Sequence, residues 1–223
     1  MPEPVAFDIE TCPLPMDTFT ARQKRRYDKE FAHASKKDAT ASLGELSRKV
    51  RSLNPWLGWI CCISVAFRHP RDGYQTTSWT AATPDEEGGM LRGFWVDVED
   101  LFRSWLFVGF NSKYFDAPFI RDRSLAHGLR LPPVAGRILS THRWRNAPHC
   151  DVAHLVHPHR VGLADLCELL GVETPKNDID GSQVAACVER GEIVRVARYC
   201  EADTRATLEC YDTLAHLAAP VIQ

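Results

Sequence analysis

The sequence predicts a single α/β domain, spanning residues 1–223, in which a mixed central sheet is flanked by helices. A chain of this length can bury one sizeable core. Strand-like apolar runs and amphipathic helical patterns follow one another in the order strand, two strands, helix, strand and further helices. The chain has no repeats, no low-complexity tracts and no linker that would divide it into two domains. These three observations favour one continuous fold.

The first predicted strand, residues 5–11, carries Asp8 and Glu10 two positions apart. Side chains of a strand alternate between its two faces, so both carboxylates project from one face while Phe7 and Ile9 point into a core. Two neighbouring carboxylates are costly unless one takes up a proton or a cation lies between them. The strand therefore indicates half of a metal site. Two solvated acids at a strand end are the alternative.

A basic insertion at about residues 17–53 follows this strand, which Pro13 and Pro15 end. It holds ten Lys and Arg against five Asp and Glu, although the formal net charge of the whole chain is only −2. That net charge argues against a simple electrostatic nucleic-acid binder. We expect a helical arm or cover beside the first strand, with a phosphate-gripping role; a mobile loop is the alternative.

A second basic stretch, residues 121–160, holds seven Arg against two Asp. Basic segments on both sides of an acidic site suit a polyanionic substrate, which is held by its phosphates. The alternative is an ordinary solvated surface with uneven charge.

The other elements are predicted from periodicity and from their flanking residues. Continuous or alternating apolar runs predict strands, spaced apolar residues predict helices, and a glycine after a helical run predicts its end. In chain order we expect a hairpin of strands at 59–67 and 74–79, a helix at 85–105, a strand at 107–110, a helix at 116–127 ended by Gly128, a short helix or strand within 134–140, a helix at 163–170 ended by Gly171, a helix opening at 181–183 and a final helix from about residue 192.

Two of these later segments carry further acids. The polar turn after the strand at 107–110 runs from Asn111 to Asp116, and Asp116 stands where a helix begins. In the final helix, Tyr199 and Asp203 are four residues apart and therefore share one helix face. These two segments supply further acids of the kind that a metal site at the first strand would need.

These three segments resemble the three motifs of DEDD exonucleases of the tyrosine subgroup. The first two are most similar to motifs of the proofreading exonuclease domain of B-family DNA polymerases and its stand-alone bacterial relatives. The resemblance spans about residues 5–213 and rests on Asp8-x-Glu10, Asn111-x-x-x-Phe115-Asp116 and Tyr199-x-x-x-Asp203. It implies an RNase H-like fold and a metal-dependent enzyme that removes nucleotides from the 3′ end of DNA, single-stranded DNA above all.

The resemblance also implies two divalent ions, Mg²⁺ or Mn²⁺, held by Asp8, Glu10, Asp116 and Asp203. Tyr199 would orient the nucleophilic water through its hydroxyl, because a free tyrosine titrates near pH ~10 and is a poor base at neutral pH. The alternative for Tyr199 is a buried aromatic residue on a helix face.

Three residues are predicted to contact substrate. The resemblance implies that Thr11 offers its backbone N–H to the terminal sugar. Phe115 is expected to stack on or wedge against a terminal base, with a place in the core as the alternative. Asn111 either binds a phosphate or sugar, or caps its turn.

A rival metal signal lies at residues 149–159, which hold four His, a Cys and an Asp. This stretch lacks the paired ligand spacing of a structural zinc site, and its Pro-rich setting predicts a loop that lines a groove. Asp151 resembles an acid common in the family, but we do not assign it to catalysis. The eight cysteines are scattered without a Cys-x-x-Cys pair and predict reduced, mostly buried thiols.

Two other functions are consistent with the sequence: an exoribonuclease of the same fold, since the same carboxylates serve both polymers, and a catalytically silent nucleic-acid-binding domain. All five motif residues are intact, which argues against the silent domain. No apolar run is long enough for a membrane span and the N-terminus lacks a signal-peptide pattern, so we expect a cytoplasmic protein. A role in DNA repair or proofreading, and any polymerase or repair partner, are left open.

Overall fold

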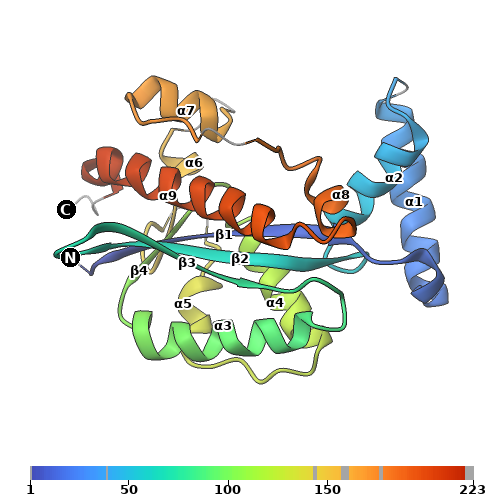
Figure 1. Cartoon of the computed structure of the whole chain (residues 1–223), viewed down its shortest axis with the longest axis horizontal. Helices are drawn as coiled ribbons and strands as arrows, with labels where there is room; N and C mark the ends of the chain where they lie inside the picture. The colour runs from blue at the N-terminus through green and yellow to red at the C-terminus, as the bar shows by residue number, and fades with distance from the viewer. Residues whose placement is uncertain (1, 39, 143–144, 157–160, 176–177, 219–223) are drawn as a thin grey trace.

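The computed structural model describes residues 2–38, 40–142, 145–156, 161–175 and 178–218. A five-stranded sheet with the order β3-β2-β1-β4-β5 forms its centre (Figure 1). The pairs β3–β2 and β2–β1 are antiparallel, whereas β1–β4 and β4–β5 are parallel, so the predicted mixed sheet is confirmed. The strands are β1 (Pro4–Pro13), β2 (Gly58–His69), β3 (Gly73–Thr80), β4 (Leu106–Gly109) and β5 (His149–Asp151).

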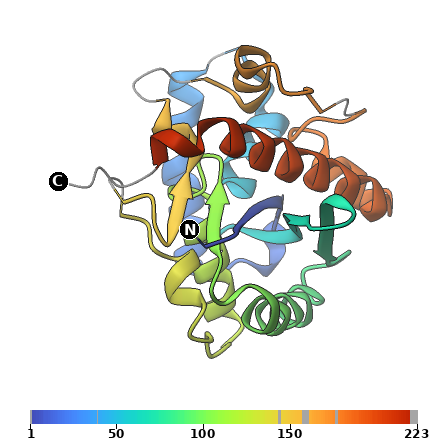
Figure 2. The same ribbon diagram turned by 90° about the vertical axis from the view of Figure 1, so that its left-hand side faces the viewer.

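Helices cover both faces of the sheet, as predicted. One long helix, α9, crosses β1, β2 and β3 on one face, and α3 and α4 lie on the other (Figures 1 and 2). A 3₁₀ turn at Met16–Thr18 precedes the first helix. The helices are α1 (Ala21–Lys37), α2 (Leu43–Ser52), α3 (Glu87–Phe102), α4 (Asp116–Ala126), α5 (Ala135–Ile138), α6 (Val152–Leu155), α7 (Leu163–Leu170), α8 (Val184–Glu189) and α9 (Ile193–Ala218).

Strand β1 is central in the sheet and separates the two layers. Phe7 and Ile9 are buried in the core that includes α3 and α4, while Ala6 is buried among residues of α7 and α9. Because side chains alternate along a strand, Asp8 and Glu10 lie on the same face as Ala6. The predicted alternation is therefore confirmed, and both carboxylates are on the α9 side of the sheet.

A buried ion-pair network fixes the position of α4. Glu87 of α3 is fully buried, and it accepts hydrogen bonds from Arg123 of α4 at 2.5 Å and from the backbone N–H of Ile60 at 2.7 Å. A second bond joins Trp95 Nε1 to Ser124 Oγ at 2.9 Å. Removing one partner of a buried ion pair costs about 3–5 kcal/mol because the other charge stays buried. The network thus holds the helix that begins with Asp116.

The basic insertion forms a helical hairpin, α1 and α2, rather than a loop; we call residues 20–53 the arm. The arm lies at the end of the sheet away from the N-terminus (Figure 1). Its two helices share a small core with Phe19 and Leu57, which flank the arm, and in this core Tyr27 stacks on Phe31 with ring centroids 5.4 Å apart. The hydroxyl of Tyr27 also donates to Ser47 Oγ at 2.8 Å. This packing makes the arm an ordered element.

Residues 149–155 are not the loop that the sequence predicts. They form β5 and α6, and His149, Cys150 and Asp151 are fully buried. Parallel pairing of β5 with β4 supplies the burial, which local sequence does not show. Residues 157–160 of the same histidine-rich stretch lie outside the described residues.

All eight cysteines are free and buried, as predicted. Within the described residues, no helix combines the length and the apolar character that a membrane span needs.

Candidate active site

The first two motifs meet through a hydrogen bond between β1 and α4. Asp116 is the first residue of α4 and only 2 % exposed. Its Oδ1 accepts the backbone N–H of Ile9 at 3.1 Å, and Ile9 lies between Asp8 and Glu10. The N-terminus of a helix favours a negative charge. The carboxylate of the second motif is therefore held beside those of the first.

The third motif is held in place by the residues between and beside its two functional side chains. Ser64 of β2 donates its hydroxyl to the carbonyl oxygen of Cys200 at 3.0 Å and also hydrogen-bonds to the hydroxyl of Thr204. Cys200 and Thr204 directly follow Tyr199 and Asp203 in α9. This buried contact orients the helix so that Tyr199 and Asp203 face β1.

The electrostatics show that the three motifs share one small volume. Burial, followed by the charges of Asp116 and Asp203, raises the pKa of Asp8 well above its usual value. Burial, followed by the charges of Asp8, Asp203 and Asp116, does the same to the pKa of Glu10. Four carboxylates from β1, α4 and α9 thus repel one another. Such a group favours protons or cations.

The same surroundings act on Asp116 and Tyr199. Burial raises the pKa of Asp116 to about 7, although the N–H of Ile9 works in the opposite direction. Burial, followed by the charges of Glu10 and Asp203, raises the pKa of the Tyr199 hydroxyl above its usual value. Tyr199 therefore keeps its proton at neutral pH and can donate a hydrogen bond.

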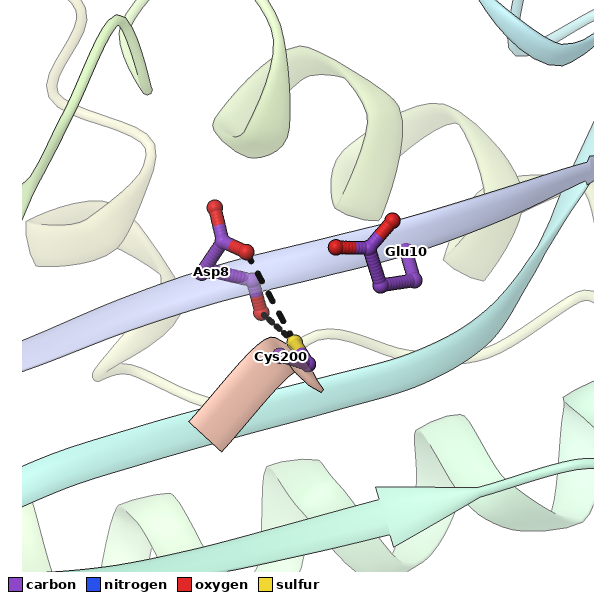
Figure 3. Close-up of side chains that lie close together, drawn as sticks. All are labelled: Asp8, Glu10 and Cys200. Carbon is purple, nitrogen blue, oxygen red and sulfur yellow. Dashed lines mark hydrogen bonds between the residues drawn. The ribbon is translucent and has the colours of Figure 1, made fainter. Parts of the chain in front are cut away.

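Cys200 is a site neighbour that sequence reasoning missed. Its Sγ donates to Asp8 Oδ2 at 3.6 Å, and the possible ligand atoms of Asp8, Glu10 and Cys200 all lie within 4.8 Å of one another (Figure 3). Its position directly after Tyr199 was the sequence feature that could have identified it as a neighbour of the site. In the described part of the chain, this trio and not the histidine-rich stretch forms a group of potential metal ligands.

The donor set fits hard divalent cations. Carboxylate oxygens are the ligands that Mg²⁺ prefers, and Asp8, Glu10, Asp116 and Asp203 supply them where an added positive charge relieves repulsion.

Asp151 positions the turn of the second motif. Its Oδ1 accepts the N–H of Asn111 at 2.8 Å and its Oδ2 accepts that of Lys113 at 3.0 Å. Asn111 has φ = 57°, a left-handed conformation that Asn tolerates better than most residues. Asp151 is fully buried, and its charge also helps raise the pKa of Asp116. It therefore acts on the site through Asp116 and the turn before it.

The structure places the three predicted substrate residues around this site. Thr11 is buried beyond a bulge after Glu10, and its hydroxyl donates to the Ser52 carbonyl oxygen at 2.8 Å. Phe115 is half-buried and packs against Phe119 with ring centroids 5.5 Å apart. Asn111 is exposed at the turn. These contacts show how each residue is held; the predicted substrate contacts stay predictions.

A cavity of about 280 Å³ adjoins the site. Tyr199 and Asp203 form one wall, and residues of α7 together with residues 174–175 and 179–180 form the other. A second cavity, of about 360 Å³, lies between α3 and residues 128–132, away from the motif residues. Of these two cavities, the first is placed to receive a group that reaches the carboxylates.

The crowded carboxylates predict that metal-free protein loses stability as pH rises. The pKa of Asp116 is raised from 3.8 to about 7, so its stabilising protonated form is fully present below about pH 4 and is lost as pH rises through 7. We expect the free energy of unfolding in EDTA to fall by a few kcal/mol between about pH 5 and pH 8. Thermal unfolding across this range, with and without Mg²⁺, measures the effect.

Asp116→Asn is the matched control for this experiment because it removes the titrating group and keeps its shape. In EDTA, the free energy of unfolding of the variant should depend less on pH than that of the wild type. In the wild type, saturating Mg²⁺ should also reduce this pH dependence, because it binds the deprotonated carboxylates. Identical pH profiles for the wild type and Asp116→Asn would contradict the prediction.

Comparison with known proteins places the chain in a family. Residues 53–221 match the model of a family described as predicted 3′-5′ exonuclease related to the exonuclease domain of PolB. The chain belongs to this family. The matched part contains Asp116, Tyr199 and Asp203, whereas Asp8, Glu10 and nearly all of the arm precede it. The predicted relationship to the exonuclease domain of B-family polymerases is confirmed.

The fold is also found in a solved structure of the family B DNA polymerase from the hyperthermophilic archaeon Pyrobaculum calidifontis. The two chains are 21 % identical with a TM-score of 0.64, and the match covers 96 % of this chain and 25 % of the polymerase chain. This similarity confirms the RNase H-like fold. The search of curated proteins found no match.

Proposed function

We propose that this exonuclease family member belongs to the tyrosine subgroup and hydrolyses phosphodiester bonds at the 3′ end of DNA, single-stranded DNA above all. The observation that carries the proposal is the convergence of four carboxylates from β1, α4 and α9 beside Tyr199. Family membership supports the reaction and its direction along the strand.

In this mechanism Asp8, Glu10, Asp116 and Asp203 hold two divalent ions, Mg²⁺ or Mn²⁺. Bound ions of this kind stabilise the attacking and leaving oxygens of a phosphodiester during hydrolysis. The protein supplies the preorganised oxygens, since the bond from Ile9 to Asp116 and the anchoring of α9 by Ser64 fix their positions before substrate arrives.

Tyr199 positions the nucleophilic water by donating its hydroxyl hydrogen bond. Its raised pKa argues against a general-base role at neutral pH. The cavity beside Tyr199 and Asp203 receives the terminal nucleotide. In the same proposal the backbone of Thr11 contacts the terminal sugar, Phe115 contacts the terminal base, and the exposed Asn111 contacts a phosphate or sugar.

The test is digestion of 5′-labelled single-stranded DNA and RNA of one sequence with Mg²⁺, Mn²⁺ or EDTA. We expect a ladder that shortens from the 3′ end of DNA, requires metal and is absent with Asp8→Asn. A ladder on RNA alone would make the protein an exoribonuclease. Binding of either strand without cleavage in any metal would reject the nuclease and favour a silent nucleic-acid-binding domain.

A further inference from the structure

One face of α1 carries a continuous stripe of basic side chains. The stripe residues are separated by three, four, four and three positions, so they lie on one helix face. All of them are exposed, and within the described residues none takes part in an ion pair. We call the following five the arm stripe: Arg22, Arg25, Lys29, His33 and Lys36.

The arm stripe lies on the side of α1 opposite its packed side. Tyr27 and Phe31 face α2 in the small core of the arm, and the helical positions of the stripe point away from both. The acids of α1 are not in the stripe, and Glu30 already accepts hydrogen bonds from Arg26 at 3.1 Å and from Asn54 at 2.7 Å. The stripe is thus a positive surface that the fold of the arm does not use.

We propose that the arm stripe binds the sugar-phosphate backbone of the substrate, at nucleotides outside the site that holds the 3′ end. The inference rests on the proposed function. At about 1.5 Å per residue the stripe is about 21 Å long. One strand of a duplex carries a phosphate about every 3.4 Å along the helix axis, so on duplex DNA the stripe would span about six phosphates of one strand.

The composition of α1 favours nucleic acid over a protein partner. Protein interfaces bury a core of apolar and aromatic residues, and the exposed large hydrophobic residues of the described chain include none from α1. Binding to a phosphate backbone needs only positive groups along a line, because counterion release provides the free energy.

The attachment of the arm places the stripe at a fixed position relative to the carboxylates. Thr11, next to Glu10, donates to the carbonyl oxygen of Ser52 at the end of α2 at 2.8 Å. Arg51 of α2 donates to the carbonyl oxygen of Leu14 at 2.8 Å. The first bond joins the base of the arm to β1, which carries Asp8 and Glu10, and the second joins it to the residue directly after that strand. A nucleic acid on the stripe is therefore tied to the catalytic end of β1.

The experiment compares two triple variants with the same change in net charge. The stripe variant is Arg22→Gln/Arg25→Gln/Lys29→Gln. The control variant, Lys24→Gln/Arg48→Gln/Lys49→Gln, removes three exposed basic groups of the arm that lie off the stripe. Dissociation constants for a long fluorescent oligonucleotide, single-stranded or duplex with a 3′ overhang, are measured in EDTA over a series of salt concentrations. Thermal unfolding checks that both variants are folded.

We expect the stripe variant to bind long DNA at least about tenfold more weakly at low salt. The slope of log Kd against log salt concentration should decrease by about 2, because three positive charges no longer neutralise phosphates. The control variant should bind like wild type. With Mg²⁺, kcat/KM is measured on the long oligonucleotide and on thymidine 5′-monophosphate p-nitrophenyl ester, which is too small to reach the stripe. The ratio of the first value to the second should fall about tenfold in the stripe variant and stay unchanged in the control variant.

Equal losses of affinity for long DNA in the two variants, or no loss of affinity in either, would overturn the proposal. Binding in EDTA is measured without cleavage, so the outcome is separate from that of the nuclease test. A wild-type protein that binds long DNA through the stripe and cleaves neither substrate would reject the nuclease and support the stripe.

Discussion

Asp8→Asn is expected to abolish cleavage and at the same time to raise the melting temperature of the metal-free protein. Asp8 lies within the charge fields of Asp116 and Asp203, and burial together with these charges raises its pKa. The amide keeps the shape of the side chain but cannot bind a divalent ion as a charged ligand. The same substitution relieves repulsion, so loss of function and gain of stability should have one cause.

The expected loss in rate is large. Metal ions contribute several kcal/mol of charge stabilisation to a transition state, and a loss of about 4 kcal/mol slows a reaction about a thousandfold. Asp203→Asn should behave alike, since its charge raises the pKa of both Asp8 and Glu10. Cleavage of 5′-labelled DNA, Mg²⁺ binding by calorimetry and thermal unfolding in EDTA measure the three consequences separately.

Asp212→Asn is the matched control because it removes a carboxylate from α9, the helix that carries Asp203. Asp212 pairs with Arg68 at 3.0 Å and accepts a hydrogen bond from the Tyr74 hydroxyl at 2.6 Å. The control should lose about 1 kcal/mol of stability and keep its activity. Full activity in Asp8→Asn, or a lower melting temperature without metal, would contradict the proposed site.

The shared faces of the candidate site residues were predictable because their spacing follows local backbone geometry. Period two puts Asp8 and Glu10 on one face of β1, and a spacing of four puts Tyr199 and Asp203 on one face of α9. The convergence of the elements was not visible in this way. It depends on contacts such as the one between Ile9 and Asp116, which are 107 residues apart. The family resemblance supplied that step.

Strand β5 and the role of Asp151 could not be predicted for a related reason. A strand of three residues has no measurable periodicity, and β5 exists through its pairing with β4. Its His149 appears polar in the sequence, yet it is buried and hydrogen-bonded to Ser112 at 2.8 Å. The histidines therefore suggested a metal, whereas the one nearest β4 supports the turn that leads to Asp116.

The contact between Ser64 and Cys200, on the α9 side of the sheet, could not be predicted from the sequence either. Ser64 lies in an apolar run and its burial was predictable, but its bond to the backbone of Cys200 joins residues 136 positions apart. This bond matters because one strand then fixes both Tyr199 and Asp203. Chemistry-bearing residue types were visible in the sequence, while the residues that orient them became visible only in the fold.

Tyr199→Phe should slow cleavage about a hundredfold, about 2.7 kcal/mol, and leave metal and DNA binding nearly unchanged. Phenylalanine keeps the ring that packs against the core, so the variant loses only the hydroxyl. That hydroxyl has a raised pKa and remains protonated, which fits the proposed role of orienting water and not that of removing its proton. Single-turnover rates with bound Mg²⁺ isolate this step from binding.

The control is Tyr211→Phe, a second tyrosine of α9, which is buried away from the carboxylates among residues of α7 and α9. It should cleave at the wild-type rate. The pH profile decides between positioning and general-base catalysis. If the hydroxyl positions water, Tyr199→Phe lowers the rate by the same factor at every pH, since no proton is lost from Tyr199. A factor that grows as pH rises would mean that the tyrosinate takes part, and the raised pKa of Tyr199 argues against that result.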